Sequence, residues 1–117
     1  MVSEPNYYSF IETAVFTRQV DSKASLDVLY AIQNDLLANP KRGDIVQGTG
    51  GVRKARVADP QSGRGKRGSY RYLYLYLEHR GRIYLLYLYG KSEQSYLSPD
   101  QKKTVARLAQ MIKEESK

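Results

Sequence analysis

The chain has 117 residues, which is enough for one domain with a hydrophobic core and too few to argue for two, so we expect a single domain over residues 1–117. Its 19 lysines and arginines outnumber its 12 aspartates and glutamates, and the net charge of +7 favours polyanionic partners such as a nucleic acid or an acidic protein. The lack of cysteine excludes disulfides and thiolate chemistry, and a single histidine argues against a zinc site or a two-histidine ribonuclease mechanism.

The N-terminal residues, Met1 to Pro5, lack the basic start and the apolar run of a signal peptide. No later apolar stretch is long enough to span a bilayer. We therefore expect a cytoplasmic protein with no membrane partner.

Two helices are expected in the first third of the chain, after a short β-prone run at residues 7–11. The first helix covers residues 14–20 and packs Phe16 inward. The second begins after Ser25, which can cap its N-terminus, and ends at Asn39-Pro40. Its apolar residues fall at helical spacing: Leu26, Leu29, Tyr30, Leu36 and Leu37.

A loop rich in glycine follows at residues 40–51. We expect it to touch the sheet through Ile45 and Val46. Its Gly48-Thr49-Gly50-Gly51 segment lacks the lysine-serine or lysine-threonine ending of a phosphate-binding loop. A tight turn is therefore the better interpretation of these glycines.

Residues 52–58 show the alternation of a half-buried strand, with Ala55 and Val57 on one face and Lys54 and Arg56 on the other. Two cations on one strand face cost packing unless something binds there, which favours an anion-binding surface. On charge alone, a solvated basic loop explains the surrounding cations equally well. These cations crowd into one segment: Arg53, Lys54, Arg56, Arg64, Lys66, Arg67 and Arg71.

Two further strands are expected at residues 70–77 and 83–89, joined by a hairpin turn at His79-Arg80-Gly81. Both are apolar on both faces, which indicates a sheet covered from two sides. Tyrosines line one face of the first strand: Tyr70, Tyr72, Tyr74 and Tyr76. We expect most of them to pack rather than to stack on bases, and His79 to play a solvated surface role.

The last helix begins at Ser98-Pro99-Asp100-Gln101, which combines an N-cap, a proline at the first helical position and a glutamine three residues after the cap. An apolar stripe follows: Val105, Leu108, Ala109 and Ile112. Residues 114–117 are expected to fray. Together these elements predict an α+β domain with a central, mostly antiparallel sheet.

Arg71 has the parity of the leucines that follow it in its strand, which places a guanidinium on a face that becomes apolar a few residues on. One interpretation is an arginine at the sheet margin that pairs with Glu93 or Asp100. The other is a clamp for a scissile phosphate, because a guanidinium can bind two phosphate oxygens at once.

Several segments of the chain together carry a family resemblance: Asn39-Pro40, Gly43-Asp44, Gly48 to Lys54, Gly65 to Gly68, Tyr70-Arg71, Ile83 to Leu86 and Tyr89 to Glu93. With these segments the chain resembles HigB-type toxins of the RelE/ParE superfamily, and the similarity runs in order from about Phe10 to the final helix. The resemblance implies a RelE-like single domain, in which N-terminal helices pack on a curved, mostly antiparallel sheet with a C-terminal helix.

The same resemblance implies candidate catalytic residues. Lys54 and Arg56 match the cation pair of the RelE strand, and Arg71 matches the arginine that follows a tyrosine in the next strand. Gly90-Lys91-Ser92-Glu93 lacks the second catalytic arginine, which leaves Lys91 as its replacement. The late RelE tyrosine has no counterpart in register, which leaves Tyr89 and Tyr96 as alternatives for its role. The catalytic candidates are Arg71, Lys54, Lys91 and Tyr89, and the candidates for RNA binding are Arg53, Arg56, Arg64, Lys66 and Arg67.

The implied function is a type II toxin that inhibits translation as a metal-independent, ribosome-dependent mRNA endoribonuclease, needs no cofactor and is neutralised by an Xre-like helix-turn-helix antitoxin. Two alternatives stay open at this point. One is a ParE-like toxin that poisons DNA gyrase, and the other is a non-catalytic module that binds nucleic acid or the ribosome through salt-sensitive phosphate contacts.

Overall fold

The computed structural model describes residues 8–60, 69–90 and 96–117. It confirms the expected α+β class, with three helices and a mixed sheet of five strands in the order β1-β5-β4-β3-β2. β1 runs parallel to β5, and all other neighbours are antiparallel. The elements in chain order are β1 (Ser9–Glu12), α1 (Ala14–Lys23), α2 (Leu26–Ala38), β2 (Asp44–Ile45), β3 (Arg53–Val57), β4 (Tyr70–Leu77), a 3-10 turn (Glu78–Arg80), β5 (Arg82–Gly90) and α3 (Pro99–Glu115).

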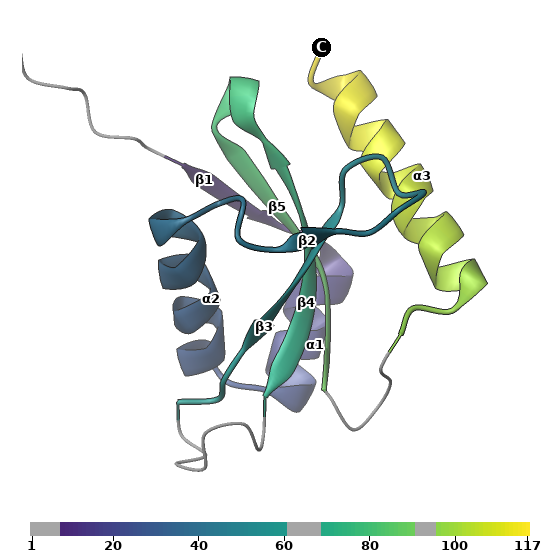
Figure 1. The fold of residues 1–117 in the computed structure, drawn as a ribbon. Helices are drawn as coiled ribbons and strands as arrows, with labels where there is room; N and C mark the ends of the chain where they lie inside the picture. Colours follow the sequence, from purple (N-terminus) through teal and green to yellow (C-terminus); the bar gives the residue numbers. More distant parts are fainter. Residues whose placement is uncertain (1–7, 61–68, 91–95) are drawn as a thin grey trace, which may run out of the picture.

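The two N-terminal helices cover one face of the sheet, and α3 lies against the other (Figure 1). Thr13 starts α1 by accepting a hydrogen bond from the backbone of Phe16 at 3.0 Å, and the helix runs three residues further than expected. Ser25 is the N-cap residue of α2, as predicted, but its side chain makes no capping hydrogen bond. No helix of the described residues is long and apolar enough to cross a membrane.

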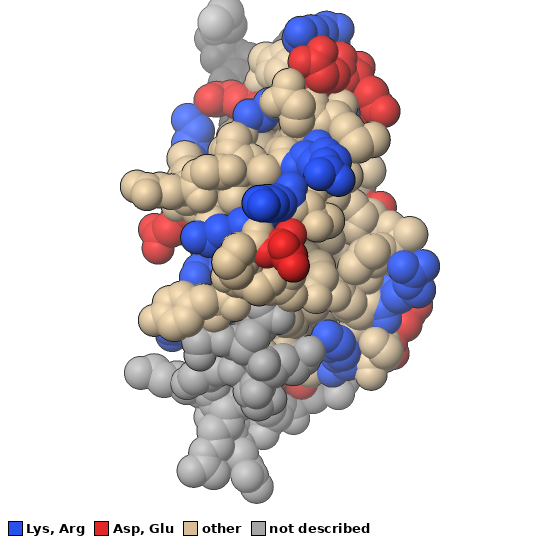
Figure 2. All heavy atoms as spheres, turned by 90° about the vertical axis from the view of Figure 1, so that its right-hand side faces the viewer, with Lys and Arg blue, Asp and Glu red and all other residues tan. Residues whose placement is uncertain are grey.

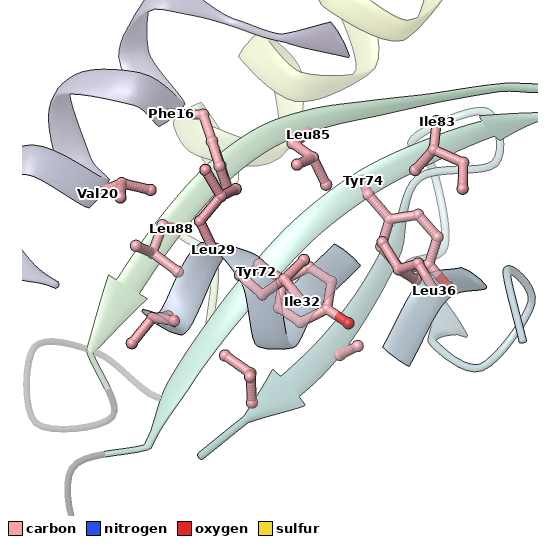
Figure 3. Packing of buried hydrophobic residues seen from close by; sticks show 13 residues of the cluster. Phe16, Val20, Leu29, Ile32, Leu36, Tyr72, Tyr74, Ile83, Leu85 and Leu88 are labelled. Atoms are coloured by element: carbon pink, nitrogen blue, oxygen red, sulfur yellow. The ribbon is translucent and has the colours of Figure 1, made fainter. Parts of the chain in front are cut away.

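The main core lies between the sheet and the helices α1 and α2 (Figure 3), where side chains from β4 and β5 meet those of both helices. Tyr72 and Tyr74 are fully buried in it, which confirms that most tyrosines of this strand pack. The Tyr74 hydroxyl donates to the carbonyl of Pro40 and accepts from the amide of Gly43, each at 2.9 Å. It thereby holds the loop that leads from α2 into β2.

The second core lies between the other face of the sheet and α3. Ser98 and Gln101 form the predicted capping box at the start of this helix. The prediction that residues 114–117 fray is wrong, because the helix continues to Glu115 and Ser116 is buried. The carbonyl of Ser116 accepts a hydrogen bond of 2.9 Å from Arg80 Nε, which ties the end of α3 to the β4–β5 turn.

A bulge in β5 changes which face its side chains occupy. Leu73 pairs with Tyr87 and Tyr74 pairs with Leu85, so Leu86 has no partner on β4. Leu86 and the next residue therefore both face α3, and Tyr89 follows onto the same side.

Candidate functional site

Four basic side chains line a cleft of ≈ 650 Å³ on the α3 side of β3 and β4. We call it the cationic cleft, and it is lined by Arg42, Asp44, Lys54, Ala55, Arg56, Arg71 and Tyr96. Figure 2 looks onto the side that carries α3 and shows lysine and arginine side chains close together near the middle of that face.

The sheet register brings the main candidates together. Arg56 is the cross-strand partner of Arg71, and Arg71 is in turn the partner of Tyr89. Directly opposed residues have Cβ atoms only about 4.5–5.5 Å apart, so these three side chains form one row across β3, β4 and β5. Lys54 lies one pleat away on the same face as Arg56, as the alternation predicts.

Arg71 has a buried guanidinium nitrogen, Nη1, with no hydrogen-bond partner among the described residues. No ion pair joins it to Asp100, and Glu93 lies outside the described residues. A buried donor that lacks an acceptor costs about 1–3 kcal/mol, and more when it is charged. The cost is removed if an anion enters the cleft, because phosphate oxygens fit a guanidinium well.

Tyr89, the neighbour of Arg71, also has a buried hydroxyl for which the described parts of the chain offer no partner. Its burial raises the pKa of this phenol, and the positive charge of Arg71 offsets part of the rise. The hydroxyl is therefore protonated at neutral pH and is a hydrogen-bond donor on the strand next to Arg71. Two unsatisfied donors thus lie side by side at one point of the sheet.

The outer rim of the cleft is formed by an aromatic ring over a cation. The Nζ of Lys54 lies 5.8 Å from the centroid of the Tyr96 ring, and Tyr96 is 82% exposed. Tyr96 and Tyr89 therefore have different surroundings: Tyr96 lines the cleft at its rim, whereas Tyr89 is buried in the core against α3.

Two residues of the cleft were missed in the sequence. Arg42 pairs with Asp35 at 2.6 Å, and Asp44 is the cross-strand partner of Lys54. Both follow Pro40 in a segment expected to be a loop, and β2 has only two residues, so no alternation revealed which face they occupy. The expectation that this loop touches the sheet through Ile45 and Val46 is confirmed, since these two pair with Arg53 and Val52.

Arg53 lies apart from the other candidates, on the opposite face of β3. Its Nη1 donates to the carbonyls of Lys41 at 3.1 Å and Gly43 at 2.7 Å. These contacts give it a role in holding the loop before β2. Four further candidates lie outside the described residues: Arg64, Lys66, Arg67 and Lys91.

Metal-binding side chains do not gather anywhere in the described parts of the chain, where no three histidines, aspartates or glutamates lie close enough to hold an ion.

Comparisons with known proteins agree with this architecture. A family model described as the RelE toxin of the RelE / RelB toxin-antitoxin system matches residues 14–117. A mutant of the Escherichia coli toxin RelE in the free state has a TM-score of 0.57 at 15% identity, over 85% of this chain and 93% of that one. The toxin in the intact E. coli RelBE toxin-antitoxin complex gives 0.56 at 14% identity, over 75% and 100% of the two chains. The isolated E. coli RelE toxin gives 0.52 at 14% identity, over 87% and 99%. At these identities the structural matches show a shared fold.

Proposed function

Because this chain belongs to the RelE toxin family, we propose that it is a toxin of the HigB-type branch that inhibits translation by cutting ribosome-bound mRNA in the cytoplasm. The observation that carries the proposal is a pair of neighbouring buried donors with no acceptor among the described residues: Nη1 of Arg71, which lines the cationic cleft, and the hydroxyl of Tyr89 on the next strand. A phosphodiester supplies the acceptors that both donors lack, together with the negative charge that offsets the neighbouring cations.

The proposed reaction is an internal transfer within the RNA. The 2′-oxygen attacks the adjacent phosphorus, the bond from phosphorus to the 5′-oxygen breaks, and the products are a 2′,3′-cyclic phosphate and a free 5′-hydroxyl. Arg71 stabilises the charge that develops on the phosphate oxygens. Lys54, as the neutral amine, takes the proton of the 2′-hydroxyl and becomes an ammonium, and the phenol of Tyr89 supplies a proton to the leaving oxygen. The reaction uses protein groups alone.

Other cations of the chain extend the contact with the RNA strand. Arg56 lies in the cleft next to Arg71 and is exposed, so it can bind a neighbouring phosphate. We propose the same role for Arg64, Lys66 and Arg67, and we propose Lys91 as an additional catalytic cation. Arg53 is left out of this set, because its guanidinium is bonded to backbone carbonyls.

The proposal includes an antitoxin partner. The complex of the E. coli relative contains a toxin together with its antitoxin. We propose that this chain is likewise held inactive by a partner, of the Xre-like helix-turn-helix type that its HigB-like sequence features imply.

The test is primer extension on a defined mRNA in a reconstituted translation reaction, with a ribosome-free reaction beside it. We expect new 5′ ends with wild-type protein and ribosomes, and a loss of about 10²–10³-fold in cleavage rate for Arg71→Ala. Arg71→Lys keeps the positive charge but cannot bind two phosphate oxygens at once. Its cleavage rate is expected to lie between those of the wild type and Arg71→Ala. Ribosome binding by both variants is measured alongside, and it should be retained.

Two outcomes of the same translation reactions would contradict the proposal. Translation that stops without new RNA ends would identify a non-catalytic binder of the ribosome. Unaffected translation, with inhibited supercoiling by DNA gyrase, would identify a gyrase poison.

A further inference from the structure

A second, smaller cleft adjoins the cationic cleft. Its volume is ≈ 250 Å³, and we call it the side cleft. The two clefts share Asp44, Lys54 and Tyr96, so a strand whose phosphate occupies the first is in reach of the second. The side cleft is lined by Asp44, Ile45, Val46, Lys54, Tyr96, Leu97 and Lys102.

The side cleft has an apolar part, and two of its large side chains are exposed. Ile45 is 55% exposed and Tyr96 is 82% exposed, although both are large side chains. Val46 and Leu97 add further apolar surface. An aromatic ring beside aliphatic side chains suits a flat, weakly polar ligand, and bases stack on tyrosine with a free energy of about 1–3 kcal/mol each.

Asp44 is the only acidic side chain that lines either of these two clefts in the described structure. Its carboxylate has no hydrogen bond or ion pair with any described residue, even though Lys54 is its cross-strand partner. A carboxylate repels phosphate, so it gains nothing from the backbone of an RNA strand. It only accepts hydrogen bonds, so it needs a ligand that offers donors.

Among the four RNA bases, guanine presents two adjacent N–H donors, at N1 and N2, and these match the two oxygens of a carboxylate. Adenine and cytosine place a ring lone pair next to their amino group, which a carboxylate repels. Uracil flanks its single N–H with two carbonyl oxygens. Proteins recognise unstacked RNA bases through such contacts with their Watson–Crick edges.

We propose that the side cleft binds one nucleobase of the RNA strand and that Asp44 makes it selective for guanine. This inference rests on the proposed function, in that it assumes an RNA strand with a phosphate in the cationic cleft. Tyr96 supplies the stacking surface at the rim, and Lys54 lies between the base and the phosphate.

The test measures binding, so that it does not depend on cleavage. Short uridine-rich RNAs that differ in one central base, and carry 2′-fluoro groups so that they cannot be cut, are titrated against the full chain by fluorescence anisotropy. We expect the guanine RNA to bind at least about fivefold more tightly than the other three, the lower end of what a good two-pronged base contact supplies, because Asp44 is exposed.

Asp44→Asn should remove the preference for guanine while raising affinity for all four RNAs, because one negative charge leaves a cationic surface. Asp21→Asn is the matched control, since Asp21 is an exposed carboxylate on α1, across the sheet from the cleft, and its replacement should leave the ranking unchanged. Tyr96→Ala should weaken binding of all four RNAs and keep their order.

Equal affinity of the wild type for the four RNAs, or a guanine preference that survives in Asp44→Asn, would overturn the inference whether or not the protein cleaves RNA. Conversely, a guanine preference that depends on Asp44, in a protein that makes no new ends in the translation reaction, supports the side cleft and overturns the ribonuclease proposal.

Discussion

Replacing Arg71 by methionine should make the folded protein more stable while abolishing its activity. The guanidinium has a buried donor with no partner in the described ranges and stands directly opposite Arg56, a second cation. Methionine keeps the long, unbranched stem and removes both penalties.

The expected gain follows from these two penalties. An unsatisfied buried donor costs about 1–3 kcal/mol, and opposed like charges add up to about 1 kcal/mol. Arg71 is partly exposed, so solvent screening reduces both. We expect the free energy of unfolding to rise by about 1 kcal/mol and the Tm by about 3–5 °C for a domain of this size.

The assay is urea and thermal unfolding followed by circular dichroism, with Arg56→Met as the matched control. Arg56 is exposed on the same face, so its replacement should change stability by less than about 0.5 kcal/mol. A fall in the stability of Arg71→Met by more than about 1 kcal/mol would refute the reasoning, because it would show that the guanidinium already has a structural partner.

Three further predictions concern the framework around the cleft. Tyr74→Phe should lower the free energy of unfolding by about 1–3 kcal/mol in urea titrations, because it leaves the amide of Gly43 unsatisfied, and an unchanged value would contradict the role given to this hydroxyl. Arg80→Ala should speed amide hydrogen exchange in the last turn of α3 and leave its first turn unaffected, whereas equal exchange in both proteins would show that Arg80 does not anchor the helix. Burial raises the pKa of Tyr72, Tyr74 and Tyr89 above the value near 10 of an unfolded chain, so stability should be complete below pH 10 and fall as the pH rises through the folded values. Absorbance at alkaline pH should show these phenols ionising together with unfolding, and independent early ionisation would contradict it.

The periodic elements could be predicted from the sequence because local pattern determines them. The alternation in residues 53–57 separated the cleft face from the core face, and the capping residues located the start of α3. The same alternation also predicts the position of Arg53. Arg53 has the parity of Ala55 and Val57, which places it away from Lys54.

Contacts between distant segments could not be predicted in the same way. The parallel pairing of β1 with β5 joins residues about seventy positions apart, and no turn fixes its register. Asp44 joins the cleft only because β2 pairs with β3 through two residues, which leave too short a pattern to recognise. Of the predicted site, the part that depends on strand faces could be located, and the part supplied by loops could not.

The unpaired Leu86 divides β5 into two parts, in which the odd-numbered side chains lie on opposite faces of the sheet. Before it, odd-numbered side chains such as Leu85 face the helices α1 and α2, and after it the odd-numbered Tyr89 faces α3 beside Arg71. Deleting Leu86 would place Leu85 next to Tyr87 in ordinary alternation, so Leu88 would stay in the main core and Tyr89 would stay beside Arg71. The deletion would therefore cost the second core one apolar side chain and leave the row of Arg56, Arg71 and Tyr89 intact.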